Sequence, residues 1–301
     1  MKDIIIIGGG PAGLTAAIYA LRSGKSVLLF EKAGYGGQIS KSHLVENYPA
    51  IKAVSGFDFS MNLYNQAKDF GCEFKRSEVI EVIDGEIKTV KTKRDEFQSK
   101  AVIFALGAEP KKSGLEKEQQ FIGRGVSYCA FCDGNFFRNK DVAVVGGGNT
   151  AVQDAIYLSE ICNKVYLIHR RDEFRAQDEV VEKLSKTENI QLVLNSVPSD
   201  IEGDKTVSAI KVKNVTDGNE TTLDVSAIFF AIGQVPSTQS FASLFPTDKY
   251  GYADIDESCK VKDGIYVCGD CRSKKVRQLT TAVSDGTVAA IEACEYLDSL
   301  K

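Results

Sequence analysis

The sequence predicts an α/β protein of two similar three-layer domains, the second inserted into the first. Three observations lead to this fold class: two apolar runs that each enter a glycine-rich turn, a helical pattern after each turn, and the recurrence of further strands at matching distances. A strand, a glycine turn and a helix are the building unit of a doubly wound parallel sheet. Two Rossmann-like domains are therefore expected, and 301 residues suffice for about two domains.

An internal repeat carries this prediction. Each copy has an apolar strand that enters a glycine turn, a second strand at the same distance after the glycines, and a third apolar strand that ends in Ala-x-Gly. The paired segments are 4–7 with 8–13 and 142–145 with 146–151, then 26–31 and 164–169, and finally 102–107 with Pro110 and 228–233 with Pro236. Two copies of one nucleotide-binding βαβ fold are implied.

The remaining elements follow in order within each copy. Residues 15–21 and 152–158 are small or apolar at helical spacing, which suits a helix that packs on a parallel sheet. Alternating segments predict a smaller β layer in each copy, at 78–83 with 86–92 and at 190–195 with 209–214. The last strand and glycine turn, 264–270, and a long helix from about 280 to 297 have no counterpart in the second copy, so they are assigned to the first domain.

Two stretches mark the crossings between the domains. Residues 110–120 are rich in Lys and Glu, and 234–240 are their counterpart on the way back. The first domain then comprises 1–112 and 243–301, and the second domain comprises 113–242.

Composition excludes several other classes of protein. The net charge of −4 comes from 37 basic and 41 acidic residues without a long run of one sign, so neither a nucleic acid nor a membrane is an expected partner. No stretch approaches the ~18 apolar residues of a spanning helix. Asp3 and the glycines from Gly8 break any apolar export signal. The eight cysteines are therefore expected to be mostly reduced, in the cytoplasm.

The first glycine motif has the pattern of a dinucleotide site. Gly8 allows the tight turn, Gly10 lets a pyrophosphate approach the backbone, and Gly13 permits close helix packing. Glu31 ends the next strand, where a carboxylate accepts from a ribose hydroxyl and repels a 2′-phosphate. This pattern indicates FAD or NAD.

The second motif replaces that acid with a basic cluster. His169 stands at the position of Glu31, and Arg170, Arg171 and Arg175 follow it. Guanidinium groups pair with phosphate oxygens, which indicates 2′-phosphate recognition and hence NADPH in this copy, with FAD in the other. The alternative is a solvated basic face paired with neighbouring acids. For His169 alone, packing or a hydrogen bond at the strand end is the alternative.

Cys129 and Cys132 form a C-x-x-C pair just before the first strand of the second domain. Such a pair can cycle between dithiol and disulfide, or it can contribute two zinc ligands. The other C-x-x-C, at Cys268 and Cys271, is much farther away than the ~15 to 20 residues of a zinc ribbon, which favours redox chemistry. No metal site is predicted, and the remaining cysteines are taken as structural.

Thiol exchange needs a proton donor or acceptor. The chain has only two histidines, His43 and His169, so Asp133 beside Cys132 is the best local candidate. Its alternative role is a cap or turn residue before Gly134.

Taken together, these residues resemble the low-molecular-weight, bacterial-type thioredoxin reductases over essentially the whole chain. The matching motifs are Gly8 to Gly13, Gly36-Gly37-Gln38, Glu46-Asn47-Tyr48-Pro49, Cys129-Ala130-Phe131-Cys132-Asp133-Gly134, Gly146 to Ala151, His169 to Arg175, and Gly269-Asp270 with Arg277-Gln278. Departures are modest, at Cys268, Cys271, Leu279 and the linker 115–120.

The resemblance implies two sets of cofactor residues. The FAD set is Gly8, Gly10, Pro11, Ala12, Gly13, Glu31, Lys32, Gly36, Gly37, Gln38, Asn47, Val82, Gly107, Gly269, Asp270, Arg277, Gln278 and Leu279. The NADPH set is Gly146, Gly148, Asn149, Thr150, His169, Arg170, Arg171 and Arg175. It also implies that Cys132 takes electrons beside the flavin, that Cys129 attacks the partner disulfide, that Asp133 is the acid, that the enzyme is a homodimer, and that its domains rotate about the linkers.

The leading hypothesis is therefore NADPH-dependent reduction of thioredoxin. A first alternative is a flavin thioredoxin reductase that takes its electrons from ferredoxin, for which loss of the arginine cluster would be the signature. A second is a flavin-bearing redox sensor without turnover, which would not require Cys129 and Cys132.

Overall fold

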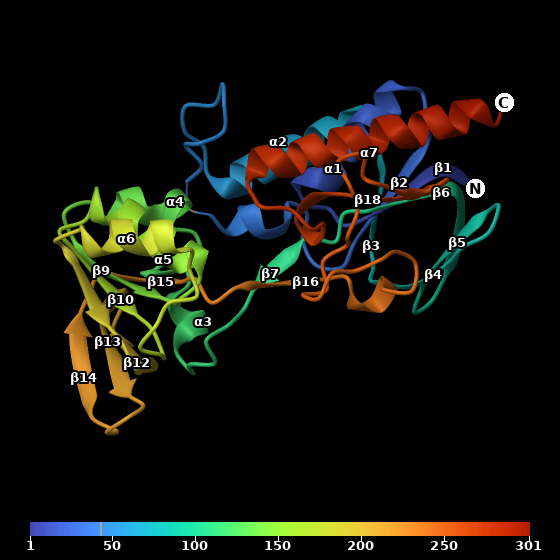
Figure 1. Cartoon of the computed structure of the whole chain (residues 1–301). Coiled ribbons are helices and arrows are strands. Elements are labelled where there is room, and N and C mark those ends of the chain that lie inside the picture. The colour runs from blue at the N-terminus through green and yellow to red at the C-terminus, as the bar shows by residue number, and fades with distance from the viewer. Residues whose placement is uncertain (43) are drawn as a thin grey trace. The chain divides into compact units, whose positions relative to one another are not determined.

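The computed structural model describes residues 1–42 and 44–301, so His43 lies outside the described residues (Figure 1). The chain divides into two compact units. The first comprises Met1–Glu109 and Val235–Lys301, and the second, inserted into it, comprises Pro110–Gln234. In the described part of the chain, no helix combines the length and the apolar character that crossing a membrane requires.

The first unit is built on a mostly parallel sheet. Its strands are β1 (Lys2–Ile7), β2 (Val27–Glu31), β3 (Glu73–Arg76), β4 (Val79–Ile83), β5 (Lys88–Thr92), β6 (Glu96–Phe104), β17 (Lys260–Lys262) and β18 (Ile265–Val267). The order is β17-β18-β6-β1-β2-β3, and β5 pairs antiparallel both with β4 and with the first part of β6. The helical segments are α1 (Pro11–Arg22), η1 (Gly37–Lys41), α2 (Gly56–Asp69), η3 (Gln239–Phe241), η4 (Gly269–Cys271) and α7 (Leu279–Ser299).

Helices α1 and α7 pack together over one face of this sheet (Figure 1). Pro11 stands at the first turn of α1, where its fixed φ suits a helix start and its missing N–H costs no hydrogen bond. A Cβ at Gly286 would lie 2.2 Å from the carbonyl oxygen of Ala12, so glycine is needed where the two helices meet. The opposite face is covered by a second apolar cluster that contains Val82, Phe104 and Phe241.

The second unit has a parallel sheet and a separate antiparallel layer. The parallel order is β11 (Ile190–Val193), β10 (Lys164–Ile168), β9 (Asp141–Val145), β15 (Ala227–Phe230) and β8 (Val126–Ser127). The antiparallel layer is β12 (Ser196–Gly203), β13 (Val207–Asn214) and β14 (Glu220–Asp224). Its helical segments are α3 (Glu118–Phe121), α4 (Ala130–Asp133), η2 (Gly134–Phe137), α5 (Asn149–Ser159) and α6 (Asp178–Ser185).

The two copies of the sequence repeat pair their strands in the same register. In the first unit Ile7 pairs with Phe30 on one side and Phe104 on the other. In the second unit Val145 pairs in the same way with Ile168 and Phe230. Each glycine turn therefore follows a central strand, where connections leave to both sides of the sheet. This is the place at which Rossmann-like folds bind nucleotides.

The two crossings between the units pair with each other. β7 (Ala108–Pro110) and β16 (Gln234–Pro236) form a two-stranded sheet. The chain rejoins the first unit at Val235, earlier than the boundary at 243 drawn from the sequence. The reason is that Phe241 packs against Phe104, a contact that only the folded chain brings together.

Candidate active site

The first glycine turn is shaped by two close backbone approaches. Gly8 has φ +114°, and a Cβ there would lie 2.2 Å from the carbonyl oxygen of Ala105. A Cβ at Gly13 would lie 1.9 Å from the carbonyl oxygen of Gly8. At Gly10, in contrast, the nearest atom in the described chain is the Cα of Gly37, at 3.8 Å. The middle glycine therefore leaves room for a ligand at the start of α1, as a pyrophosphate requires.

Glu31 at the end of β2 is held against this turn. One of its carboxylate oxygens accepts from the N–H of Gly9 at 2.8 Å, and the other accepts from the N–H of Ala33 at 2.8 Å. Each carboxylate oxygen has a second lone pair. A fixed carboxylate with spare acceptor capacity suits a ribose hydroxyl at this position.

Asp270 in η4 offers a second polar group in the same unit. Its Oδ1 is buried and has no hydrogen-bond partner in the described part of the chain, although Lys274 Nζ lies 3.7 Å away. Burial raises the pKa of this carboxyl group, and the nearby Lys274 and Arg277 oppose that rise. A buried oxygen without a partner is costly unless a ligand hydroxyl supplies one.

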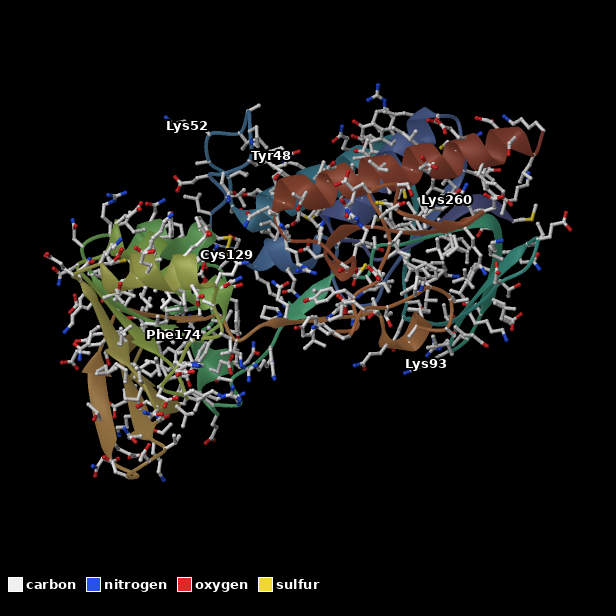
Figure 2. All side chains as sticks on the ribbon, viewed as in Figure 1. Tyr48, Lys52, Lys93, Cys129, Phe174 and Lys260 are labelled. Atoms are coloured by element: carbon white, nitrogen blue, oxygen red, sulfur yellow. A yellow bond between two sulfur atoms is a disulfide. The ribbon has the colours of Figure 1, made fainter. Side chains whose placement is uncertain are left out.

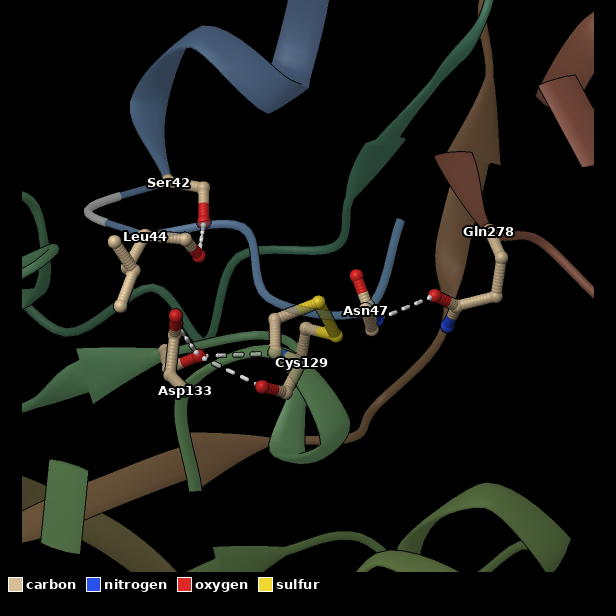
Figure 3. Close-up of a disulfide and its surroundings, with 8 residues drawn as sticks. Ser42, Leu44, Asn47, Cys129, Asp133 and Gln278 are labelled. Carbon is tan, nitrogen blue, oxygen red and sulfur yellow. Dashed lines mark hydrogen bonds between the residues drawn. A yellow bond between two sulfur atoms is a disulfide. The ribbon is translucent and has the colours of Figure 1, made fainter. Parts of the chain in front are cut away.

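The other residues of the predicted FAD set are distributed around the first unit. Gly36 donates from its backbone N–H to the carbonyl oxygen of Gly9 at 2.7 Å, which ties the segment of Gly37 and Gln38 to the glycine turn. Asn47 donates to Gln278, the residue before α7 and Leu279, at 3.4 Å (Figure 3). Arg277 donates to the carbonyl oxygen of Asp270.

Three members of that set have less to offer through their side chains. Lys32 is exposed, and its Nζ lies 3.9 Å from Oε1 of Glu109. Val82 is buried in the second apolar cluster, on the face of the sheet opposite α1 and α7. Gly107 has φ +69°, and a Cβ there would meet no heavy atom of the described chain within 4 Å. Any contribution of Gly107 to a ligand site would come from its backbone.

The second glycine turn repeats the first. A Cβ at Gly146 would lie 2.5 Å from the carbonyl oxygen of Ala231, whereas a Cβ at Gly148 would have no heavy atom of the described residues within 4 Å. Asn149 and Thr150 are exposed at the start of α5. The open middle glycine again leaves space for a pyrophosphate.

A loop after β10 is fastened to this second turn. The N–H of Arg175 donates to the carbonyl oxygen of Gly147 at 2.8 Å, and the N–H of Gln177 donates to the side-chain oxygen of Asn149 at 2.8 Å. The basic cluster is therefore held beside the glycine turn by its backbone, and its side chains are left for other contacts.

His169 is a packed residue of this loop. It is 7% exposed, its Nε2 lies 3.1 Å from the carbonyl oxygen of Glu173, and its ring stacks on Phe174, which is labelled in Figure 2. Burial, together with the three neighbouring arginines, lowers the pKa of the imidazole. A neutral ring lies against Gly147, where a Cβ would come within 2.1 Å of it. These contacts favour the packing role for His169.

The arginines themselves are exposed. Arg170, Arg171 and Arg175 form no ion pair with a carboxylate of residues 1–42 or 44–301, including the adjacent Asp172 and Glu173. The alternative of a basic face that is paired with its neighbouring acids is therefore not supported for these described residues. The three arginines follow β10 in the loop fastened to the second glycine turn, the region in which a 2′-phosphate would lie.

The cysteine pair forms a disulfide across the short helix α4. Cys129 caps α4 in an extended conformation, Cys132 lies within it, and their Cα atoms are 5.3 Å apart. Ser127 in β8 accepts from the N–H of Cys129 at 3.1 Å and donates to Asp133 at 2.6 Å. A redox-competent disulfide and a carboxylate thus share one hydrogen-bonded turn.

Known proteins are similar to this chain over nearly its whole length. The family model for pyridine nucleotide-disulphide oxidoreductases matches residues 2–286. The chain belongs to this family. It is 42% identical to the thioredoxin reductase of Listeria innocua, over 99% of this chain and 95% of that protein. The crystal structure of the thioredoxin reductase of Streptococcus pyogenes is 38% identical, with a TM-score of 0.93 and coverage of 99% of both chains.

The second C-x-x-C pair of this oxidoreductase is unlike the first. Cys268 packs with Cys259 in the core under α1 and α7, whereas Cys271 packs in the cluster on the opposite face of the sheet. Burial raises the pKa of the Cys271 thiol to about 11 and that of Cys268 well above its ordinary value. Buried, protonated thiols on different faces are poor partners for exchange.

Two contributors to the oxidoreductase site were missed from the sequence. Ser127 carries no motif of its own, and its role follows from the position of β8 beside α4. Gln177 contributes a backbone N–H, which any residue except proline could supply. No sequence pattern would have singled out either residue.

Proposed function

We propose that this protein is an NADPH-dependent thioredoxin reductase, which moves two electrons from NADPH to the disulfide of a thioredoxin. The observation that carries the proposal is the Cys129–Cys132 disulfide beside Asp133, in the unit that also holds the second nucleotide turn. Its support from relatives is that proteins named thioredoxin reductase are similar to it over 95% or more of their length.

NADPH is assigned to the second unit. The pyrophosphate would lie over Gly148 at the start of α5, and the 2′-phosphate would meet Arg170, Arg171 and Arg175. Guanidinium groups that have no carboxylate partner lose little when they bind a phosphate, because no existing ion pair must be broken. NADH lacks that phosphate and is expected to bind much more weakly.

FAD is assigned to the first unit, whose residues fit it. The space at Gly10 suits the pyrophosphate, Glu31 suits the adenosine ribose, and the unpartnered Oδ1 of Asp270 suits a hydroxyl of the ribityl chain. The chemistry that bound FAD supplies is the relay of two electrons between a nicotinamide and a disulfide.

The dithiol step uses the residues of α4. In the reduced protein the Cys129 thiolate attacks one sulfur of the partner disulfide, and a mixed disulfide forms while the partner's other sulfur leaves as a thiolate. Asp133 is assigned to supply a proton to that leaving sulfur. Cys132 then gives up its proton and attacks the sulfur of Cys129, the bond from Cys129 to the partner breaks, and the leaving partner sulfur takes up a proton. The enzyme disulfide is restored and the partner is released as a dithiol. Two electrons and two protons pass to the partner.

An anaerobic titration of the flavin-loaded protein tests the donor. NADPH should bleach the flavin absorbance far more effectively than NADH, and about two equivalents should be consumed because the flavin and the disulfide are both reducible. Equal response to both nucleotides would contradict the NADPH assignment, and absence of bleaching by either would contradict the proposed electron donor.

Replacement of one cysteine tests the acceptor side. Cys129→Ser should abolish reduction of thioredoxin while NADPH still bleaches the flavin, because the nucleotide sites are untouched. A flavin-bearing sensor without turnover would reduce no thioredoxin either before or after this change. Normal thioredoxin reduction by Cys129→Ser would overturn the interchange role.

A ferredoxin-dependent flavin thioredoxin reductase is the alternative of the same class. The structure of such an enzyme from Clostridium acetobutylicum is 31% identical, with a TM-score of 0.53 and coverage of 99% of this chain and 98% of that chain. The arginine cluster beside the second glycine turn favours NADPH here. Flavin bleaching by reduced ferredoxin, with no response to NADPH, would reverse that preference.

Two further assignments belong to this proposal. We expect a homodimer, which sedimentation would reveal as twice the mass of the chain, and a cytoplasmic location, which fractionation of the source cells would test. A monomer in sedimentation with full activity would contradict the dimer.

A further inference from the structure

Ser127 occupies an unusual place between the two ends of the redox turn. It is 6% exposed and ends β8, which pairs with the buried strand β15 through Phe229. Its hydroxyl accepts from the N–H of Cys129 at 3.1 Å and donates to Oδ2 of Asp133 at 2.6 Å. One buried oxygen therefore connects the cap of α4 with the carboxylate at its end.

Each of these two bonds meets a specific need. Cys129 precedes the first turn of α4, where backbone N–H groups have no partner inside the helix, so Ser127 satisfies an N–H that would otherwise lack one. The Asp133 carboxylate can rotate about its own side-chain bonds, and a donor fixed on a strand restricts that rotation. Because β8 is anchored in the parallel sheet, the donor is part of the rigid framework of the unit.

We infer that Ser127 is a positioning residue that keeps Cys129 and Asp133 in their reactive arrangement after the disulfide opens. In the oxidised protein the S–S bond itself joins Cys129 to Cys132. Reduction removes this covalent link. The backbone bonds from Cys132 and Asp133 to the carbonyl oxygen of Cys129 then hold the turn, and the Ser127 hydroxyl holds the carboxylate and the Cys129 N–H.

This inference rests on the proposed function, because the attack of Cys129 on a partner disulfide is the step that needs the arrangement. In that step a bond forms between Cys129 and one partner sulfur, the partner S–S bond breaks, and the leaving sulfur takes a proton that Asp133 is placed to supply. A misplaced carboxylate slows this proton transfer and leaves the supply of electrons from NADPH unchanged.

The test compares Ser127→Ala with Ser127→Thr in the flavin-loaded protein. We expect Ser127→Ala to slow thioredoxin reduction by about ten- to a hundredfold, the factor for loss of a hydrogen bond to a charged group. The rate of flavin bleaching by NADPH and its KM should stay at the wild-type level. Ser127→Thr keeps the hydroxyl and should restore most of the rate.

A second measurement does not depend on thioredoxin. Iodoacetamide should alkylate Cys129 of the reduced protein at a different rate in Ser127→Ala than in wild type, with Ser127→Thr close to wild type, as read by mass spectrometry. The matched control is Ser159→Ala, which removes a hydroxyl that donates to the backbone of Ile156 in the same unit. It should alter neither rate.

The outcomes separate this inference from the proposed function. If Ser127→Ala reduces thioredoxin and is alkylated as fast as wild type, the positioning role is wrong. If Ser127→Thr fails as severely as Ser127→Ala, or flavin bleaching slows in parallel, Ser127 is only structural and the inference is again overturned. If wild type reduces no thioredoxin but the alkylation rates still differ as expected, the proposed function fails while the positioning of Cys129 stands.

Discussion

At the scale of single residues, the two copies of the repeat differ most at one position. Glu31 and His169 both lie against the middle of a glycine turn, but Glu31 presents a carboxylate there and His169 presents a packed, neutral ring. Under the proposed function, recognition of the 2′-phosphate in the second copy is assigned to the arginines that follow. The sequence could show the exchange of an acid for a base, but it could not show that His169 stacks on Phe174.

The first prediction concerns these arginines. The double variant Arg170→Gln with Arg171→Gln should raise the KM for NADPH by about ten- to a hundredfold, because charge-assisted hydrogen bonds to the 2′-phosphate are lost. The KM for NADH should change little. Steady-state kinetics with both nucleotides measures the effect, and Arg124→Gln, at another exposed arginine of the unit, is the control. Equal losses with both nucleotides would show that the arginines do not read the phosphate.

The second prediction concerns Asp154 on α5. This side chain is 6% exposed and has no hydrogen bond or ion pair in the described part of the chain, and burial raises its pKa to about 7. The unfolded chain releases this proton near pH 4. Because the folded form binds the proton more tightly, the free energy of unfolding falls as the pH rises from about 4 to 7 and stays lower above that range.

Asp154→Asn removes the buried charge and should stabilise the second unit by up to about 4 kcal/mol at pH 8, since three pKa units correspond to roughly that amount. At pH 4 the gain should disappear. Urea unfolding at the two pH values measures it, with Glu160→Gln, an exposed acid at the end of the same helix, as the control. If the gain in the free energy of unfolding were the same at both pH values, the raised pKa of Asp154 would be contradicted.

At the scale of elements, the glycines of the two turns have different tasks. Gly13 lies against the backbone of its own turn, while Gly10 and Gly148 face open space. Gly286 has a task of the first kind, between α7 and α1. Glycine thus serves packing at some positions and ligand access at others, and only the folded structure separates the two uses.

The third prediction uses this contrast. Gly286→Ala should destabilise the first unit by about 1 to 3 kcal/mol, because its Cβ would overlap the backbone of Ala12 and the helices must separate. Gly148→Ala should leave thermal stability unchanged and weaken NADPH binding, because its methyl group would occupy the space for the pyrophosphate. Thermal unfolding and nucleotide titration of the two variants measure the difference. Equal instability of both would refute the assignment of open space at Gly148.

The strongly periodic elements could be predicted from the sequence. The central strands, the helices after both glycine turns and α7 lie where apolar spacing placed them. Helices α2 and α6 were not predicted, although Ser55 caps α2 by accepting from the N–H of Asp58, and this Ser-x-x-Asp pattern is a recognisable start signal. The predicted boundary at 243 lies later than Val235 because Phe241 is identified as a core residue only through its distant contact with Phe104.

At the scale of the whole molecule, one chain carries two independent cores. Each unit has apolar clusters on both faces of its own parallel sheet. The paired strands β7 and β16 are the covalent crossings between them, with a hydrogen bond from Lys111 to Gly233 and another from Ser237 to Gly107. Cores without shared residues are expected to unfold as separate cooperative units.

The fourth prediction follows from this separation and from the assignment of one nucleotide to each unit. Calorimetry of the protein should show two unfolding transitions. NADP⁺ at about a hundred times its dissociation constant should stabilise one of them by roughly 3 kcal/mol, because a ligand that binds only the folded form adds its binding free energy to that unit. Removal of FAD should lower the other transition and leave the first in place.

The double variant Arg170→Gln with Arg171→Gln provides the control within the same experiment. It should abolish most of the NADP⁺ shift without altering the response to FAD, since the arginines lie in Pro110–Gln234 and the residues assigned to FAD lie in the other unit. A single transition that moves with either ligand would mean that the units unfold as one body. A NADP⁺ shift in the FAD-dependent transition would mean that the nucleotides are assigned to the wrong units.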